Sequence, residues 1–340
     1  MILVTGGLGY IGSHTVVELL EEGFEVLVVD DLSNSSLDVL KGIERACGKR
    51  PLFECLSLSN RISVKTLFHK YLDIQGIIHF AASKAVGESV SKPLAYYDNN
   101  LTSLLFFLQE MEVHNLSIPL IFSSSCTVYG EPDTLPITEQ APIKKATSPY
   151  GNTKQIGEEI IWDTLKSNEK LSAIILRYFN PIGAHDSLEI GELPIGIPQN
   201  LVPFITQTAV GLRDKLIVFG DDYPTRDGTC IRDYIHVVDL AKAHLIALQR
   251  LMAHKNEDRY EVFNLGTGKG NSVLEVIKCF ERVSGMKLNY GIGPRREGDV
   301  VAAYADVSKA NELLKWNAIL SLDDAMASAW EWEQKIRTNN

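Results

Sequence analysis

Two residues with complementary acid–base chemistry, Tyr150 and Lys154, lie four positions apart in the chain. On a helix, side chains at this spacing share one face and lie about 6 Å apart. A free tyrosine has a pKa of about 10, too high for a base at neutral pH, but a nearby ammonium favours the phenolate. The pair is therefore a candidate for proton transfer with a substrate hydroxyl, and Lys154 would tune Tyr150.

A serine provides the third candidate catalytic group. The apolar stretch 119–125 predicts a strand that ends in Ser123, Ser124 and Ser125, 25 residues before Tyr150. A hydroxyl at the end of a strand can donate a hydrogen bond to a substrate oxygen, although serines there are more often turn or cap residues. Spacing alone does not decide which of the three hydroxyls would do so, and we favour Ser125.

The start of the chain has the pattern of a dinucleotide-binding loop. An apolar strand over 2–4 runs directly into Gly6, Gly9 and Gly12, spaced G-x-x-G-x-x-G. The first glycine permits a tight turn, the second lets a phosphate approach the backbone, and the third lets the following helix pack closely on the strand. A helix over 11–22 would then direct its first N–H groups at a pyrophosphate.

A second strand, over 26–29, ends in Asp30. A carboxylate at this position accepts hydrogen bonds from the adenosine ribose hydroxyls and repels a 2′-phosphate. The sequence therefore predicts NAD rather than NADP as the cofactor.

The first half of the chain alternates between predicted strands and helices. Strands are expected at 52–56, 76–82, 119–125 and 172–180, and helices up to 47 and at 64–71, 94–114 and 151–166. This alternation predicts an α/β fold with a Rossmann-type doubly wound parallel sheet. Residues 83–89 are expected to form a loop at the carboxyl end of a strand, where such folds bind ligands.

Beyond residue 180 glycine and proline become dense and the regular alternation stops. Helices at 200–210, 239–252 and 272–284 mix with an extended stretch at 216–219, and a terminal helix carries two tryptophans. A strand at 260–265 is expected to return to the main sheet. We predict an NAD-binding domain over 1–180, with strand and helix returns from about 230–265, and a smaller mixed α/β C-terminal lobe over 181–340 that binds the substrate.

Composition excludes several classes of function. The 340 residues are 45% hydrophobic and 22% charged, with a net charge of −10, which argues against a nucleic-acid surface. No apolar run reaches the roughly 18 residues of a membrane span, and the first strand leaves no room for a signal peptide. Five scattered cysteines and eight histidines show no metal-ligand spacing. We expect a cytoplasmic protein without a metal.

Seven motifs carry a resemblance to a known family. The chain resembles the UDP-glucose 4-epimerase family, within the NAD-dependent epimerase/dehydratases of the extended short-chain dehydrogenase/reductase superfamily, over essentially its whole length. The matching motifs are Gly6-Gly-Leu-Gly-Tyr-Ile-Gly-Ser-His14, Lys84-Ala-Val-Gly-Glu-Ser89, Tyr96-Tyr-Asp-Asn-Asn100, Ser123-Ser-Ser-Cys-Thr-Val-Tyr-Gly130, Leu176-Arg-Tyr-Phe-Asn-Pro181, Arg232-Asp-Tyr-Ile-His-Val237 and Arg295-Arg-Glu-Gly-Asp299.

The resemblance implies a tightly held NAD that is reduced and reoxidised within each turnover. Tyr150 would take the proton of the sugar 4-hydroxyl, and Ser125 with Thr127 would bind the reacting oxygen. Lys154 would also bind the nicotinamide ribose. The 4-keto sugar would turn over and be reduced on its other face, which interconverts UDP-glucose and UDP-galactose in galactose metabolism. A homodimer built from the helices over 94–114 and 151–166 is implied as well.

The resemblance also implies two sets of binding residues. Cofactor contacts are expected from Gly6, Gly9, Tyr10, Ile11, Gly12, Asp30, Asn34, Ser57, Leu58, Phe80, Ala81, Ala82, Lys84, Asn99, Tyr150, Lys154 and Phe179. Contacts to the UDP-sugar are expected from Lys84, Ser125, Thr127, Tyr150, Asn180, Asn200, Leu201, Phe219, Arg232, Arg296, Asp299 and Ala303. The two arginines also make sense physically, because a planar guanidinium binds a diphosphate with two parallel hydrogen bonds.

The chain departs from the family pattern at two positions. Leu56-Ser57-Leu58 stands where the family usually has Gly-Asp-Ile, so Ser57 replaces an aspartate that binds the adenine amine. Ala303 stands where family members confined to UDP-glucose and UDP-galactose have a tyrosine, and members that accept N-acetylated sugars have a small residue. We expect this chain to convert UDP-N-acetylglucosamine and UDP-N-acetylgalactosamine as well.

Three other functions share parts of this pattern. A nucleotide-sugar 4,6-dehydratase would need an acid pair after the serine strand, where this chain has Cys126 and Thr127. A uronate-type UDP-sugar epimerase or decarboxylase would need only a small change in the pocket and stays open. A catalytically silent NAD-binding regulator would tolerate the loss of Tyr150 or Lys154, and both are present.

Overall fold

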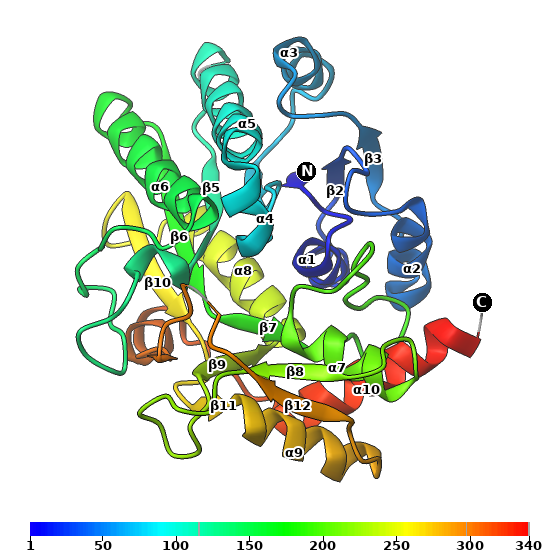
Figure 1. Cartoon of the computed structure of the whole chain (residues 1–340). Coiled ribbons are helices and arrows are strands. Elements are labelled where there is room, and N and C mark those ends of the chain that lie inside the picture. Colours follow the sequence, from blue (N-terminus) through cyan, green and yellow to red (C-terminus); the bar gives the residue numbers. More distant parts are fainter. Residues whose placement is uncertain (115, 297, 339–340) are drawn as a thin grey trace. The chain divides into compact units, whose positions relative to one another are not determined.

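The computed structural model describes residues 1–114, 116–296 and 298–338, which form two compact units (Figure 1). The first unit consists of Met1–Gly130, Pro142–Arg177 and Ala241–Phe263. The second consists of Glu131–Ala141, Tyr178–Leu240 and Asn264–Asn340. The chain therefore passes between the units several times, and each unit is assembled from three separate segments.

The first unit is built on a seven-stranded sheet with the order β10-β6-β5-β4-β1-β2-β3. The central strands pair in parallel, with Leu3 opposite both Leu27 and Ile77. This sheet confirms the predicted Rossmann-type fold, including the return of the 260–265 strand to its edge. The strands are β1 (Ile2–Thr5), β2 (Val26–Asp30), β3 (Leu52–Cys55), β4 (Gly76–His79), β5 (Pro119–Ser125), β6 (Ser172–Tyr178) and β10 (Tyr260–Leu265).

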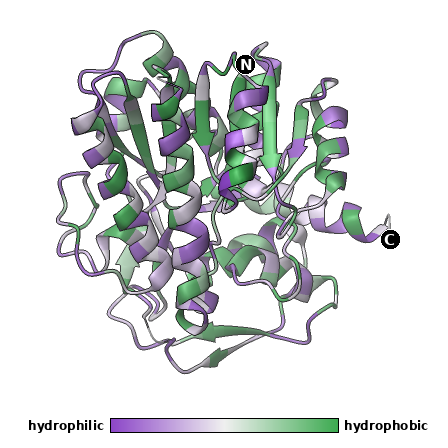
Figure 2. Ribbon diagram, turned by 90° about the horizontal axis from the view of Figure 1, so that it is seen from above, coloured by the Kyte–Doolittle hydropathy of each residue, from purple (hydrophilic) through white to green (hydrophobic). Residues whose placement is uncertain are grey.

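Helices cover both faces of this sheet (Figure 1). Leu3, Leu27 and Ile77 point to one face, where they share a buried core with helices α3 (Arg61–Lys70), α5 (Pro93–Val113) and α6 (Pro149–Ser167). The other face carries α1 (Tyr10–Glu21), α2 (Leu37–Cys47) and the first-unit part of α8 (Val237–Met252). Figure 2 shows the strands near the N-terminus in green, as expected for strands buried on both faces.

The predicted loop over 83–89 is wrong in its second half. A short helix, α4 (Val86–Ser91), begins there and ends at Lys92, directly before Pro93 opens α5. The hydroxyl of Tyr96 accepts from the N–H of Ala85 and donates to the carboxylate of Glu88. This tertiary contact, rather than local propensity, holds a helix whose sequence contains glycine, valine and two serines.

The second unit combines two small sheets with helices. Strand β9 (Ile231–His236) pairs with β11 (Gly270–Ser272), β13 (Ala302–Ala303) and β7 (Asn180–Ile182), and β8 (Leu216–Phe219) pairs with β12 (Tyr290–Gly293). The remaining elements are the 3-10 helix η1 (Cys126–Tyr129) in the first unit and, in the second, α7 (Leu201–Ala209), α9 (Val273–Ser284), η2 (Ala310–Leu314) and α10 (Leu322–Thr338).

Strand β9 was not expected from the sequence, because Arg232 and Asp233 make it look polar. Its far end supplies Tyr234 to a buried core that also contains Ile205 of α7, Phe280 of α9 and Trp330 of α10. Among the described residues no helix is long and apolar enough to cross a membrane.

Candidate functional site

Helix α6 places Tyr150 and Lys154 in its first two turns. Ser148 caps the helix by accepting from the N–H of Gly151, and Pro149 occupies the first helical position, where its missing N–H costs nothing. The exposed fractions of Tyr150 and Lys154 are only 7% and 4%. Lys154 Nζ lies 5.9 Å from the centre of the Tyr150 ring, so the predicted helical pair exists.

Lys154 is held in a largely apolar setting. Its Nζ donates to the carbonyl oxygen of Ser123 at 2.6 Å and lies 5.0 Å from the centre of the Phe122 ring. Burial lowers the pKa of Lys154 to about 8, while the carboxylate of Glu158, one turn further along α6, raises it. A lysine with such a pKa is protonated at neutral pH yet close to its titration range.

The serine strand leads into η1, and its hydroxyls have different partners. Ser124 donates to Oε1 of Glu158 at 2.5 Å, so this hydroxyl is used within the protein. Ser125 Oγ accepts from the N–H of Thr127 at 3.2 Å, which leaves its proton available for donation. Within the described ranges Thr127 Oγ1 is buried and has no hydrogen-bond partner, as expected of a group that bonds to a ligand.

The glycine loop has the predicted geometry. Gly6 adopts φ +65°, and a Cβ there would lie 2.9 Å from the N atom of Ala81. A Cβ on Gly12 would lie 2.3 Å from the carbonyl oxygen of Gly6, so only glycine lets α1 approach this closely. Helix α1 begins after Gly9 without a side-chain cap, which leaves its N-terminus suited to an anion. Ile11 and Tyr10 lie in its first turn.

Asp30 ends β2 with a carboxylate whose orientation is fixed. One oxygen accepts from the N–H of Leu8 at 3.1 Å, and the other accepts from the N–H of Leu32 and the hydroxyl of Ser35 at 3.0 and 2.7 Å. Asn34 lies in the same turn and is exposed. The carboxylate thus joins the glycine loop to the turn that follows β2.

The region after β3 is organised by small polar contacts. Ser57 Oγ accepts from the N–H of Ser59, and Ser59 in turn donates to Oδ1 of Asn99 at 3.3 Å. Leu58 is buried in the core. Of the three cofactor candidates Ser57, Leu58 and Asn99, only Ser57 and Asn99 therefore offer polar side chains. Asn99 also donates to the hydroxyl of Ser83.

The remaining cofactor candidates of the first unit lie after β4. The Phe80 ring packs 4.7 Å from the His244 ring, and the N–H of Ala81 donates to Thr5 Oγ1 at 3.3 Å. Ala82 is partly exposed beside them, and Lys84 Nζ lies 5.8 Å from the centre of the Tyr10 ring. This set therefore adjoins the glycine loop through Thr5 and Tyr10.

Two buried polar residues near Lys154 were missed from the sequence. His79 is fully buried, bonds to Thr5 through Nδ1 at 2.9 Å and lies stacked on Phe122. Burial, together with the Lys154 charge, lowers the pKa of His79 to about 3, so it is neutral. Glu158 is the other, and its spacing of four from Lys154 was a usable signal, because it continues the Tyr150–Lys154 face.

In the second unit four predicted substrate residues form one cluster. Asp299 accepts from Arg296 at 2.7 and 3.1 Å, and its Oδ1 lies 3.6 Å from Nη2 of Arg232. The Arg296 guanidinium lies 5.7 Å from the centre of the Phe219 ring. Two cations thus converge on one carboxylate beside an aromatic ring. Glu297, part of the same motif, lies outside the described residues.

Ala303 belongs to this cluster by register. It pairs with Arg232 across the parallel strands β13 and β9, and residues in register point to the same face of a sheet. Ala303 is 7% exposed, so its methyl group lies against the protein rather than in solvent. A larger side chain here would be directed to the Arg232 side of β13.

The other predicted substrate residues lie elsewhere in the second unit. Asn180 begins β7, and Phe179 before it is buried. Asn200 and Leu201 stand at the start of α7, and Asn200 Nδ2 donates to Glu192 at 2.6 Å. No hydrogen bond or ion pair of the described residues joins these three substrate candidates, or the cofactor candidate Phe179, to the arginine cluster.

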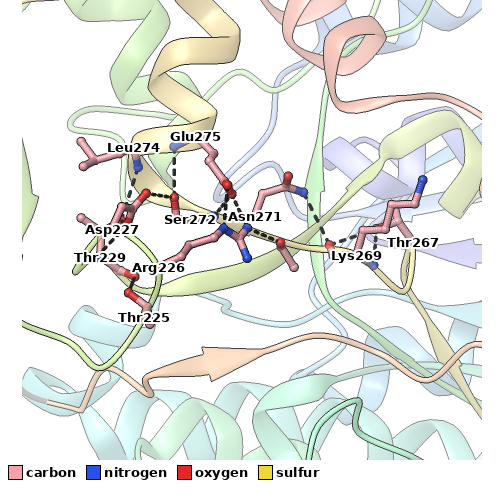
Figure 3. Close-up of polar contacts among 11 residues, drawn as sticks. Thr225, Arg226, Asp227, Thr229, Thr267, Lys269, Asn271, Ser272, Leu274 and Glu275 are labelled. Atoms are coloured by element: carbon pink, nitrogen blue, oxygen red, sulfur yellow. Dashed lines mark hydrogen bonds and ion pairs between the residues drawn. The ribbon is translucent and has the colours of Figure 1, made fainter.

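A polar network holds the strand next to Arg232 in place (Figure 3). Arg226 donates to both carboxylate oxygens of Glu275 and to the carbonyl of Gly270. Ser272 caps α9 through Glu275 and donates to Asp227, which also accepts from Thr229. These contacts fix the position of β11. Strand β11 pairs with β9, and Asn271 lies opposite Arg232.

Across the parts of the chain that the structure describes, no group of three or more His, Cys, Asp or Glu side chains is arranged to hold a metal ion.

Comparison with known proteins gives consistent matches. A family model described as GDP-mannose 4,6 dehydratase matches residues 3–329. A UDP-glucose 4-epimerase of Bacillus subtilis is 49% identical over 332 residues, covering 98% of this chain and 96% of that protein.

Two solved structures are similar over almost their whole length. One is UDP-glucose 4-epimerase from Bifidobacterium longum in complex with NAD+ and UDP, with 47% identity, a TM-score of 0.94 and coverage of 100% of this chain and 99% of that one. The other is the UDP-Glc/GlcNAc 4-epimerase from Campylobacter jejuni, with 38% identity, a TM-score of 0.83 and coverage of 98% and 99%. The chain therefore belongs to the UDP-glucose 4-epimerase family of extended short-chain dehydrogenase/reductases.

Proposed function

We propose that this protein is an isomerase that interconverts UDP-glucose and UDP-galactose by transient oxidation at C4 of the sugar. The observation that carries the proposal is the buried Tyr150–Lys154 pair on α6 in the same unit as Ser125 and Thr127, whose buried Oγ1 has no partner in the described structure. Relatives about half identical to the chain are UDP-glucose 4-epimerases.

NAD is the cofactor. Its pyrophosphate would lie at Gly9 and the uncapped start of α1, and its adenosine ribose would bond to Asp30. A Cβ on Gly6 or Gly12 would clash with backbone atoms of Ala81 or Gly6, so these glycines permit the tight loop that brings the uncapped start of α1 to the pyrophosphate, and the residues present fit the cofactor. Bound there, NAD would supply the hydride acceptor and donor for C4 of the sugar.

Tyr150 holds and moves the proton. Its phenolate oxygen takes the proton of the 4-hydroxyl while C4 is oxidised, and gives it back to the 4-oxygen when C4 is reduced. The positive charge of Lys154 stabilises the phenolate. Ser125 donates its free proton to the 4-oxygen, and Thr127 Oγ1 gains the partner that it lacks.

The arginine cluster binds the diphosphate. Arg232 and Arg296 are already drawn together by Asp299, so little side-chain entropy is lost when an anion joins them. The first unit would thus serve as the NAD-binding domain and the second as the UDP-sugar-binding lobe, with Asn180, Asn200, Leu201 and Phe219 as further contacts to the UDP-sugar.

We propose further that N-acetylated UDP-sugars are substrates. Ala303 lies in register with Arg232, so the residue type at position 303 controls space on the face that binds the nucleotide sugar. A methyl group leaves room for a 2-acetamido group, which a phenol ring would occupy. A family member that is 38% identical is described as a UDP-Glc/GlcNAc 4-epimerase.

The assembly proposed is a cytoplasmic homodimer formed through α5 and α6. These helices pack on each other within the first unit and expose Leu94, Val113 and Trp162, with exposed fractions of 82%, 72% and 46%. Light scattering after size-exclusion chromatography would give twice the monomer mass of 37.7 kDa, and a mass of one chain would refute the dimer.

The function is tested by incubating purified protein with UDP-glucose and, separately, UDP-N-acetylglucosamine, with no NAD added. Proton NMR should show the C4 epimer of each. Epimer from UDP-glucose alone would retain the mechanism and refute the role of Ala303. No product from either sugar, even after NAD is added, would refute the proposed function.

A further inference from the structure

A buried ion pair lies next to the segment 123–129, which contains the candidate catalytic residues Ser125 and Thr127. Glu158 of α6 and Arg177 of β6 are each 6% exposed and join through two hydrogen bonds, Nε to Oε1 at 3.0 Å and Nη2 to Oε2 at 2.5 Å. A buried ion pair costs desolvation energy that its own attraction repays only in part, so its presence beside the catalytic helix calls for a reason.

The pair bonds to the segment on both sides of Ser125 and Thr127. Before them, Ser124 donates to Oε1 of Glu158. After them, the hydroxyl of Tyr129 accepts from Nη1 of Arg177 at 3.1 Å, and the Arg177 guanidinium lies 4.9 Å from the centre of the Tyr129 ring. All four side chains are buried.

The pair also places charge near Lys154. Glu158 lies one helical turn beyond Lys154, and its carboxylate raises the pKa of that lysine against the effect of burial. The other groups that face Lys154 are Tyr150 on the same helix, the neutral His79 of β4, and the Ser123 carbonyl and Phe122 ring of β5.

We infer that Glu158 and Arg177 are positioning residues of the proposed reaction. They hold Ser125 and Thr127 in register with Tyr150 by fixing the residues on either side, and the Glu158 carboxylate keeps Lys154 in its charged form. This inference rests on the proposed function. Neither Glu158 nor Arg177 is proposed to contact the substrate.

The chain contains a matched control in the same unit. Arg250 of α8 and Glu261 of β10 form a second, partly buried pair with two hydrogen bonds, Nε to Oε2 at 2.8 Å and Nη2 to Oε1 at 2.9 Å. Glu158→Gln and Glu261→Gln each leave one buried or partly buried guanidinium without its carboxylate, so both should lower the melting temperature.

The two variants should differ in the pH dependence of kcat. Loss of the Glu158 charge lowers the pKa of Lys154, so the fall of kcat on the alkaline side should move to lower pH by about one unit in Glu158→Gln. Glu261→Gln should keep the wild-type profile. A second readout is the ultraviolet absorbance of the Tyr150 phenolate, taken as the difference from Tyr150→Phe in the same background, which should appear at higher pH in Glu158→Gln.

A milder variant tests the positioning role without a change of charge. Tyr129→Phe removes only the hydroxyl that accepts from Arg177, and kcat should fall about fivefold with KM and the alkaline limb unchanged. The inference is wrong if, with an active wild type, two results are found together. These are the same pH profile of kcat for Glu158→Gln and Glu261→Gln, and full kcat for Tyr129→Phe. An inactive wild type would instead refute the proposed function.

Discussion

The two units of the molecule carry their candidate site residues in opposite physical settings. In the first unit Tyr150, Lys154 and Ser125 are buried, Lys154 donates to a backbone carbonyl, and Ser125 accepts from a backbone N–H. In the second, Arg232 and Arg296 converge on Asp299, and the Arg296 side chain is 56% exposed. Burial shifts pKa values, which proton transfer requires, whereas a guanidinium binds a diphosphate in its permanently charged form, without any proton transfer.

The comparison predicts that variants of the first unit mainly lower kcat. Tyr150→Phe removes the group that takes the proton and should reduce kcat by about 10² to 10⁴-fold, with KM for UDP-glucose changed little. Tyr97→Phe is a suitable control, because the Tyr97 hydroxyl bonds to Asn152 on the same helix. Steady-state kinetics would contradict the assignment if the two variants were equally active.

Variants of the second unit should mainly raise KM. Arg232→Met removes a charged donor and should raise KM for UDP-glucose by about 10 to 100-fold while kcat changes less. Arg282→Met, which breaks the exposed ion pair with Asp323, should leave both parameters unchanged. A purely kcat effect in Arg232→Met would remove the contrast between the two units.

Within the second unit, position 303 should control the choice of sugar. Ala303→Tyr fills the space beside Arg232, so turnover of UDP-N-acetylglucosamine should be lost while turnover of UDP-glucose persists within a few-fold. Ala303→Ser, of nearly unchanged size, should keep both. Survival of both activities in Ala303→Tyr would show that this position does not select the substrate.

The smallest effect is expected on the adenine side of the first unit. Ser57→Asp supplies the carboxylate that the family usually has and should tighten NAD binding about fivefold, the effect of one charged hydrogen bond. The fraction of NAD retained after gel filtration would measure it, with Ser57→Ala as control. Equal retention by the two variants would show that Ser57 does not contact the adenine.

The sequence predicted the main sheet and the Tyr150–Lys154 helix, because both depend on local patterns. Gly6 and Gly12 occupy positions where a Cβ would meet backbone atoms, so their spacing carries the geometry. The position of Asp30 at the end of β2 follows from the same pattern.

The sequence was less informative where long-range pairing decides. Strand β9 has charged residues at its start and exists because β11, β13 and β7 pair with it. The assignment of residues 131–141 to the second unit depends on Ile137, which bonds to Tyr304 and Asp306 far along the chain. No local pattern marks such contacts, so the arginine cluster could be proposed only through family resemblance.

In the proposed mechanism, the hydrogen removed from C4 returns to C4 within one turnover. The most direct test is to convert UDP-glucose in D₂O with purified protein and to examine the UDP-galactose by mass spectrometry and proton NMR. The product should retain protium at C4, because only the hydroxyl proton passes through Tyr150. Deuterium at C4 would contradict it, since the carbon-bound hydrogen would then have exchanged with solvent.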